Sequence, residues 1–234
     1  MDRDGPRRGP YPYDYEKMEP APRGEFPVSG ARAFCHREPV PGDIAPGFVV
    51  AAPSLRDPNF ARSVVLLVEH GTGGSLGFVV NRPSPLPWAT VKKALGLPQD
   101  EDERAMPVFS GGPVSPQSGW ILFDPRPAPK EHVEDAMVLD ERLAVSASRT
   151  LLDRLARPGA WAGDRVLALG YAGWAGGQLD RELESGVWLP ASLDPRMVFD
   201  VAPQDRWERV LRAAGIEPGR IVSPLKKPGP HSLS

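Results

Sequence analysis

Two apolar runs joined by a glycine-rich loop constrain the fold more than any other feature of the sequence. The first run, SVVLLVEH at 63–70, does not alternate between apolar and polar residues, which is typical of a strand buried on both faces. GTGG follows at 71–74, and SLGFVVN at 75–81 is again apolar and β-rich. Two such runs separated by a short glycine loop predict a β-hairpin in the core.

The rest of the body mixes short strands with short helices. The apolar patterns predict strands at 47–55, 106–114, 119–124, 136–139, 143–146, 165–173, 187–193 and 196–201. The 3.6-residue period predicts helices at 85–98, 148–159, 177–186 and 203–215. The last is the clearest, because Pro203 suits a first turn, Gly215 suits a helix end, and an apolar stripe runs between them through Trp207, Val210, Leu211 and Ala214. Strands in hairpins with inserted helices indicate an α+β fold.

Proline separates this body from its ends. The chain has 29 prolines in 234 residues, and nine of them fall within residues 1–46, which show neither a helical nor an alternating period. Such a segment buries too little apolar surface to offset its ordering entropy, so we expect a disordered or extended tail at 1–46. Three tyrosines among these prolines leave open that the tail docks on a partner in extended form. We expect one domain at 47–223 and a flexible C-terminal tail at 224–234.

Composition limits the classes of function. The single cysteine, Cys35, excludes an intrachain disulfide and a four-thiolate metal site. No apolar run approaches the roughly 20 residues of a membrane span, and no secretory signal is evident, so we expect a cytoplasmic protein without a membrane partner. The formal net charge is −2 and the body carries no long basic run, which argues against tight, direct nucleic-acid binding.

Two glycine motifs suggest chemistry and are better explained by turns. Residues 73–77 match the G-x-S-x-G nucleophile elbow around Ser75, but a strand-like segment follows where the elbow needs a helix. The third member of such a triad would be His231, close to the chain end. The spacing of Gly71, Gly73 and Gly77 is one residue too long for a dinucleotide fingerprint. We therefore expect a hairpin turn here and no cofactor.

Metal binding is not supported by the histidines. The four, which share no helical turn with one another, are His36, His70, His132 and His231. Acidic residues surround His132 at 130–135, but clustered charges usually form a solvated surface. We expect no metal site.

Two glycine-rich loops are the candidate binding site. Consecutive glycines after a strand, as in the group Gly111, Gly112 and Pro113, let backbone N–H groups converge on an anion, or simply allow the chain to turn. The stretch GYAGWAGGQ has the same two interpretations, because it leads into a helix N-terminus that attracts anions. Its candidate ligand-binding or partner-binding residues are Tyr171, Trp174, Gly176, Gly177 and Gln178.

Several strings, in this order, resemble the AlgH/YqgE family of bacterial proteins. They are APSLRDPNFARSVVLLVEH, GSLGFVVNRP, FSGGPV, LALGYAGWAGGQLDRELESGVWL and DRWERVLRAAGI. The resemblance covers about residues 47–222 and implies an α+β domain with a branched, partly barrel-like, mainly antiparallel sheet flanked by helices. The family is usually labelled as a regulator of transcription, through an association with alginate control. Relatives often end in a Gly-His-Ala element, where this chain reads PHSLS.

Two hypotheses of function follow. The first is a regulator that acts through a protein partner or a small anionic ligand and has no DNA-reading motif. The alternative is an unrecognised enzyme with its site at the glycine-rich loops 111–113 and 171–178, for which Asn81, Asp180 and Glu182 are candidate acids or bases.

Overall fold

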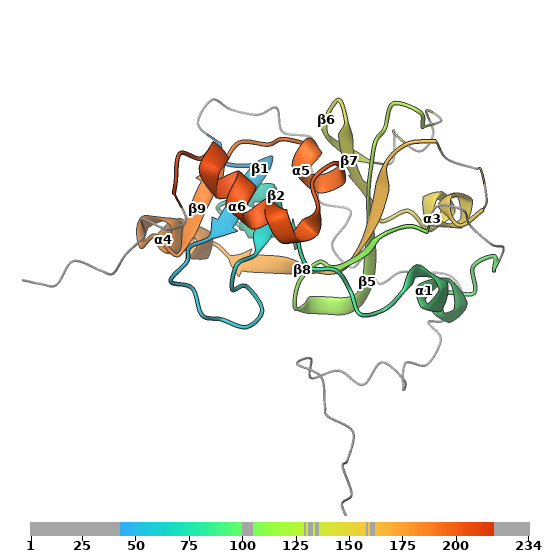
Figure 1. The fold of residues 1–234 in the computed structure, drawn as a ribbon, viewed down its shortest axis with the longest axis horizontal. Coiled ribbons are helices and arrows are strands. Elements are labelled where there is room, and N and C mark those ends of the chain that lie inside the picture. Colours follow the sequence, from blue (N-terminus) through green and yellow to red (C-terminus); the bar gives the residue numbers. More distant parts are fainter. Residues whose placement is uncertain are drawn as a thin grey trace, which may run out of the picture.

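One long strand, β8 (Arg165–Ala175), organises the fold. The protein is seen in a computed structural model that describes residues 43–99, 105–128, 136–157 and 162–217, with the single residues 130, 133 and 159 (Figure 1). Strand β8 pairs antiparallel with β3 (Gly74–Val79) and β5 (Val114–Phe123), and parallel with β4 (Val108–Ser110). Because three strands share β8, the sheet branches there.

The other strands extend the sheet to either side of this branch. The order is β6-β7-β5-β8-β3-β2-β1-β9, with β4 off the path. The bounds of the remaining strands are Gly47–Ala51 for β1, Val64–Gly71 for β2, Met137–Asp140 for β6, Leu143–Ser146 for β7 and Trp188–Ala191 for β9. All pairings except β4 with β8 are antiparallel. Since β6 and β9 are its two ends and do not meet, the sheet is not closed.

The predicted core hairpin is confirmed. Strand β2 pairs with β3 from Val65 opposite Val79 to Gly71 opposite Gly74, and the first five residues of β2 are fully buried. Gly77 is required inside β3, because a Cβ atom there would lie 2.6 Å from the Leu66 carbonyl oxygen. The non-alternating apolar run is therefore explained by burial on both faces of the sheet.

Five helices cover the sheet in the described part of the chain. Helices α1 (Trp88–Ala94) and α3 (Arg149–Leu155) lie near one end, and the N-cap of α3 is Ser148, whose side chain accepts a hydrogen bond from the Leu151 amide. Helices α4 (Gln178–Glu184), α5 (Arg196–Phe199) and α6 (Pro203–Ala213) lie toward the other end (Figure 1). The helices pack on three apolar clusters of the core: α5 and α6 on one, α1 and α3 on a second, and α4 on a third.

The sequence prediction was wrong at one segment and too short at two others. Residues 196–201 were expected to form a strand, but Arg196–Phe199 form helix α5. The Asp194 carboxylate accepts from the Arg196 amide, and the Pro195 carbonyl accepts from the Phe199 amide, so a local turn competes successfully with the strand-like apolar pattern. The predicted strand at 165–173, which already included Tyr171, continues to Ala175 and so places Trp174 inside β8 as well. The strand predicted at 119–124 begins earlier, at Val114, as β5.

Part of the chain lies outside the described residues. This part includes residues 1–42 of the predicted tail, the predicted tail at 224–234, Cys35 and three of the histidines, His36, His132 and His231. Within the described part, no helix has the length and apolarity that crossing a membrane requires.

Candidate functional site

The loop Gly111–Pro113 packs directly against β8. A Cβ atom on Gly111 would lie 2.5 Å from the Gly170 carbonyl oxygen, and one on Gly112 would collide with the Tyr171 backbone. Gly112 also has a φ of 155°. The two glycines are thus required by the close approach of two backbones, and Pro113 beside them is exposed.

The second loop meets the turn of the β2–β3 hairpin. A Cβ atom on Gly176 would collide with the Thr72 carbonyl oxygen, and Gly177 has a φ of 69° at the N-cap of α4. Gln178, the first residue of α4, accepts a hydrogen bond from the Ala175 amide through its side chain at 3.1 Å. The glycines here allow a tight turn from β8 into α4.

The structure brings the 111–113 loop against Tyr171, the first residue of the 171–178 stretch, but the turn at Gly176–Gln178 lies elsewhere. Tyr171, half-buried, meets the Trp120 ring edge-on at 6.4 Å, at the Gly112 end of this stretch. Gly176 lies five residues further along, or about 15 Å at the rise of a strand. Neither of the two cavities described below is lined by a residue of either loop.

An aromatic cluster around Glu182 fixes α4 on the sheet. The Nε1 atoms of Trp174 and Trp188 donate to Glu182 Oε2 at 2.9 and 2.8 Å, and Gln178 Nε2 donates to Oε1 at 2.9 Å. The Trp174 and Trp188 rings pack edge-to-face at 5.6 Å, and the Phe60 ring contacts both. Trp174, predicted as a binding residue, is 7% exposed and belongs to this buried cluster.

A chain of polar contacts lies beside this cluster. Ser75 Oγ and His70 Nδ1 are 2.8 Å apart across the β2–β3 hairpin, and His70 Nε2 is 3.3 Å from Asp180 Oδ1 on α4. The order Ser–His–Asp is that of a catalytic triad, but the two imidazole nitrogens have exchanged partners relative to it, and Ser75 is only 9% exposed. Asn81, which the sequence analysis named with Asp180 and Glu182 as a candidate acid or base, has a structural role. Its side chain accepts a hydrogen bond from the Val64 amide and donates one to the Arg62 carbonyl.

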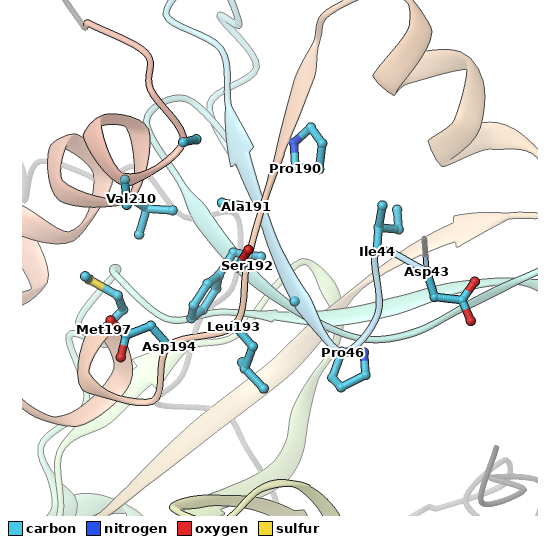
Figure 2. Close-up of a pocket in the computed structure, with 14 residues that line it drawn as sticks. Asp43, Ile44, Pro46, Pro190, Ala191, Ser192, Leu193, Asp194, Met197 and Val210 are labelled. Atoms are coloured by element: carbon cyan, nitrogen blue, oxygen red, sulfur yellow. The ribbon is translucent and has the colours of Figure 1, made fainter. Parts of the chain in front are cut away.

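Two cavities lie on the side of the sheet that carries α6. The first, of about 590 Å³, is enclosed by the start of β1, the end of β9, α5 and α6. Figure 2 shows Met197 and Val210 on one side of it and Ile44 and Pro46 on the other. Its acidic groups, Asp43 and Asp194, are not buried, and Asp194 is paired with the Arg196 guanidinium beside it.

The second cavity, which we call the Arg206 cavity, differs in holding a buried charge. Its volume is about 550 Å³, and it lies between the first residues of β8, the segment before β4, and the α5–α6 turn. A volume in this range is typical of small-molecule sites. Its lining residues include Met106, Phe109, Asp164, Val198, Asp200 and Arg206.

Helix α6 carries Arg206 into the interior. Arg206 is 3% exposed, its Nε donates to the Val201 carbonyl at 2.9 Å, and its Nη1 donates to the Val80 carbonyl. The guanidinium carbon lies 5.1 Å from the centre of the Phe109 ring, a cation–π contact. Burial lowers the pKa of Arg206 to about 10, so the residue remains charged at neutral pH.

Sequence reasoning missed Arg206, although a signal was present. Arg206 precedes Trp207 and lies four residues before Val210, so it falls on the apolar stripe of α6 rather than on the solvent face. A charged residue at such a position is rarely buried without a specific reason. The glycine-rich loops were predicted as the site instead. Glycines occur wherever two backbones come close, whether or not a ligand binds there.

The architecture defines the protein as an α+β protein with an open, branched sheet and a ligand-sized cavity beside its C-terminal helix. The chain belongs to the AlgH-like family, whose model matches residues 48–219. It is 45% identical to a UPF0301 protein of Anaeromyxobacter dehalogenans, over 78% of this chain and 93% of that protein. A UPF0301 protein of Vibrio cholerae is 35% identical, over 75% of this chain and 94% of its own length.

Solved structures agree with this assignment. The solution structure of AlgH from Pseudomonas aeruginosa is similar with a TM-score of 0.63 and 32% identity, covering 77% of this chain and 94% of that one. A crystal structure of a Corynebacterium diphtheriae protein is similar with a TM-score of 0.56 and 29% identity, covering 77% of this chain and 90% of the other. The family resemblance and the α+β class predicted from the sequence are therefore confirmed.

Proposed function

We propose that this protein is a regulator that acts by binding a small ligand in the Arg206 cavity, rather than by reading DNA or by catalysis. The observation that carries the proposal is a cavity of about 550 Å³ in which one charged side chain, Arg206, is buried beside apolar residues, while the other charged lining residues, Asp164, Arg165 and Asp200, are exposed or half-buried. Few polar groups in an apolar pocket are the usual design of a site that recognises a small molecule.

Helix α6 argues against a DNA-reading role. Helix α5 and α6 follow one another after a short turn, as in a helix-turn-helix, but α5 has only four residues. One face of α6 is buried on the sheet, and Glu208 on its outer side pairs with Arg212 at 3.0 Å and with Arg62 at 3.6 Å. Since acids offset the arginines there, α6 lacks the basic face that phosphate contacts require.

The alternative of an enzyme at the glycine-rich loops has weaker support. Gly111, Gly112 and Gly176 serve close backbone approach and Gly177 a positive φ. Glu182 and Asn81 are engaged in holding the fold. The Ser75–His70–Asp180 chain is the one arrangement that favours catalysis, and a chemical test of it is described in the Discussion.

Ligand capture tests the proposed function. The full-length protein is incubated with the small-molecule fraction of a bacterial extract, washed, denatured, and the released compounds identified by mass spectrometry. Ala105→Trp places a large side chain at an exposed residue that lines the Arg206 cavity, whereas Ala89→Trp does so on the outer face of α1. We expect a compound retained by wild type and Ala89→Trp but not by Ala105→Trp. Equal retention by all three proteins, or retention of nothing, contradicts the proposal.

A further inference from the structure

Arg206 is a buried positive charge without a carboxylate partner in the described part of the chain. Arg82, by comparison, donates to three backbone carbonyls at an exposed site, and Arg142 contacts both Asp164 and Asp200. No ion pair joins Arg206 to any described acid, and its lowered pKa has burial as its only cause. Removing a guanidinium from water is costly, and buried charges are therefore normally paired. Among the described residues Arg206 therefore has room for an anion, and the cavity that it lines is where such an anion would lie.

The guanidinium is held in a fixed orientation that leaves one nitrogen available. Nε and Nη1 are anchored on the Val201 and Val80 carbonyls, and the Phe109 ring lies against the group. Nη2 makes no hydrogen bond to a described residue, while Arg206 lines the cavity. A guanidinium has five N–H donors, so donors remain for a ligand oxygen.

The first turn of α6 adds to the positive potential at the same place. Ala202, the N-cap of α6, and Pro203 both line the Arg206 cavity, and no side chain caps this helix. The 11-residue helix therefore points its positive dipole end, which the first-turn acid Asp205 offsets in part, toward the region that Arg206 occupies.

The remainder of the cavity specifies the rest of the ligand. Met106, Phe109 and Val198 are buried apolar residues in its lining, which suits an apolar or aromatic body. Two carboxylates, Asp164 and Asp200, also line it, and each lies 3.4 Å from an Arg142 nitrogen. The lining thus holds two acids, Asp164 and Asp200, and two arginines, Arg165 and Arg206, so a ligand with a single negative charge suits it better than a dianion such as a phosphate monoester.

We infer that the Arg206 cavity binds an organic carboxylate, a monoanion attached to an apolar or aromatic body, and that Arg206 recognises the carboxylate group. This inference rests on the proposed function, because it names the ligand class of the same cavity. The carboxylate oxygens accept from Arg206 Nη2, and the body lies among the apolar side chains.

Three matched probes test the ligand class on the full-length protein. Phenylacetate, its neutral analogue phenylacetamide and the dianion phenyl phosphate are titrated, with binding followed by calorimetry and by heteronuclear NMR of the α6 amides. We expect phenylacetate to shift the α6 resonances and the amide to bind about tenfold more weakly or worse, a difference of about 1.4 kcal/mol. Equal binding of acid and amide, tighter binding of phenyl phosphate, or no binding of phenylacetate overturns the inference.

Variants separate recognition from folding. Arg206→Met removes the charge, and Arg209→Gln removes an exposed charge from the same helix as a control. Ala202→Asp keeps Arg206 and supplies the missing N-cap, so it preserves or raises the melting temperature while placing a negative charge at the cavity. Pro87→Asp makes the same change at the N-cap of α1, away from the cavity. We expect Arg206→Met and Ala202→Asp to lower phenylacetate affinity about tenfold or more, and both controls to bind as wild type.

The two proposals fail in distinguishable ways. If extract compounds are retained through the cavity but prove to be neutral, or if Ala202→Asp binds phenylacetate as tightly as wild type, the ligand class is wrong and the proposed function stands. If Ala105→Trp retains every compound that wild type retains, the proposed function fails, and this inference fails with it.

Discussion

The indole nitrogens of Trp174 and Trp188 donate to the same carboxylate oxygen, Oε2 of Glu182. Because Trp174 is in β8, Trp188 is in β9 and Glu182 is in α4, this one oxygen joins three elements of the fold. We expect Glu182→Ala to lower the free energy of unfolding by about 2–4 kcal/mol, since two buried N–H groups lose their acceptor. Glu182→Gln keeps an acceptor oxygen and is expected to cost less. Urea denaturation of both variants measures this, and a loss below 1 kcal/mol in Glu182→Ala contradicts the structural role.

Gly177 provides a test of whether the second glycine-rich loop is more than a turn. Its φ of 69° is unfavourable for other residues, and an added Cβ atom would lie 3.2 Å from Arg181 Nη1. We expect Gly177→Ala to cost about 1 kcal/mol or slightly more. Gly186, also with a positive φ but with open space around it, is the matched control at the far end of α4.

The measurement for Gly177→Ala is a melt paired with the ligand capture described above. Equal destabilisation of Gly177→Ala and Gly186→Ala, with every wild-type ligand retained, shows a purely conformational requirement. Loss of a ligand by Gly177→Ala alone, at temperatures where it is folded, shows that the loop contributes to binding.

The sequence was most informative where one physical effect dominated. Burial on both faces determined the β2–β3 hairpin, and a continuous apolar stripe with Pro203 at its start determined α6. The pattern failed at Arg196–Phe199, where an aspartate side chain bonded to a nearby amide favoured a helical turn over a strand. In a short apolar segment, local hydrogen bonds decide between helix and strand, and the periodicity of the sequence does not reveal these contacts.

The candidate cavity could not be located from the sequence, because its parts are far apart along the chain. Phe109, Asp164 and Arg206 meet only through the pairing of β4 with β8 and the packing of α6 on the sheet. The position of Arg206 on an apolar stripe was visible, but its lack of a carboxylate partner depends on the whole three-dimensional neighbourhood. In contrast, the glycine-rich loops were conspicuous for a reason that the structure explains by backbone contact.

Stability at acid pH is expected to depend on Asp124. This residue is 3% exposed, and Arg126 donates to it through Nη2 at 2.6 Å and Nε at 2.9 Å. The side-chain hydrogen bonds from Arg126 lower the pKa of Asp124 below its ordinary value of 3.8. Because the pKa of Asp124 is lower in the folded state than in the unfolded state, ionised Asp124 stabilises the fold at any pH above its unfolded-state pKa. This stabilisation is lost as the pH falls through its folded-state pKa.

Asp124→Asn tests this dependence. We expect the variant to be less stable than wild type at pH 7 by about 1–2 kcal/mol, and the difference to shrink as the pH is lowered below about 4. Asp153→Asn, in the exposed pair of Asp153 with Arg149, is the control and is expected to change stability by less than about 0.5 kcal/mol. A difference between wild type and Asp124→Asn that stays constant from pH 7 to pH 2 contradicts the role of the ionised carboxylate.

Duplex DNA is expected to bind weakly and without sequence preference. The formal net charge is −2, and acids accompany the arginines on the outer side of α6. At about 0.15 M salt we expect a dissociation constant of about 10 µM or higher, and we expect the affinity to fall further as the salt concentration is raised. Fluorescence anisotropy with a random-sequence duplex and a genomic fragment library measures this. A sequence-selective complex in the nanomolar range would show that the protein reads DNA directly.

Ser75 is expected not to act as a nucleophile, despite its contact with His70. In a serine hydrolase the hydroxyl is presented at an accessible turn, next to donors that stabilise the oxyanion. Ser75 instead lies within β3, directly across from His70 on β2 and Trp174 on β8, and is 9% exposed. A fluorophosphonate probe is therefore expected to leave the folded protein unlabelled, and Ser75→Ala to cost about 1 kcal/mol through the lost hydrogen bond to His70.

Asp180→Asn is the companion variant, since it alters the partner of His70 Nε2 without touching the hydroxyl. Stoichiometric labelling that Ser75→Ala abolishes and Asp180→Asn slows would establish a working triad and make the protein an enzyme.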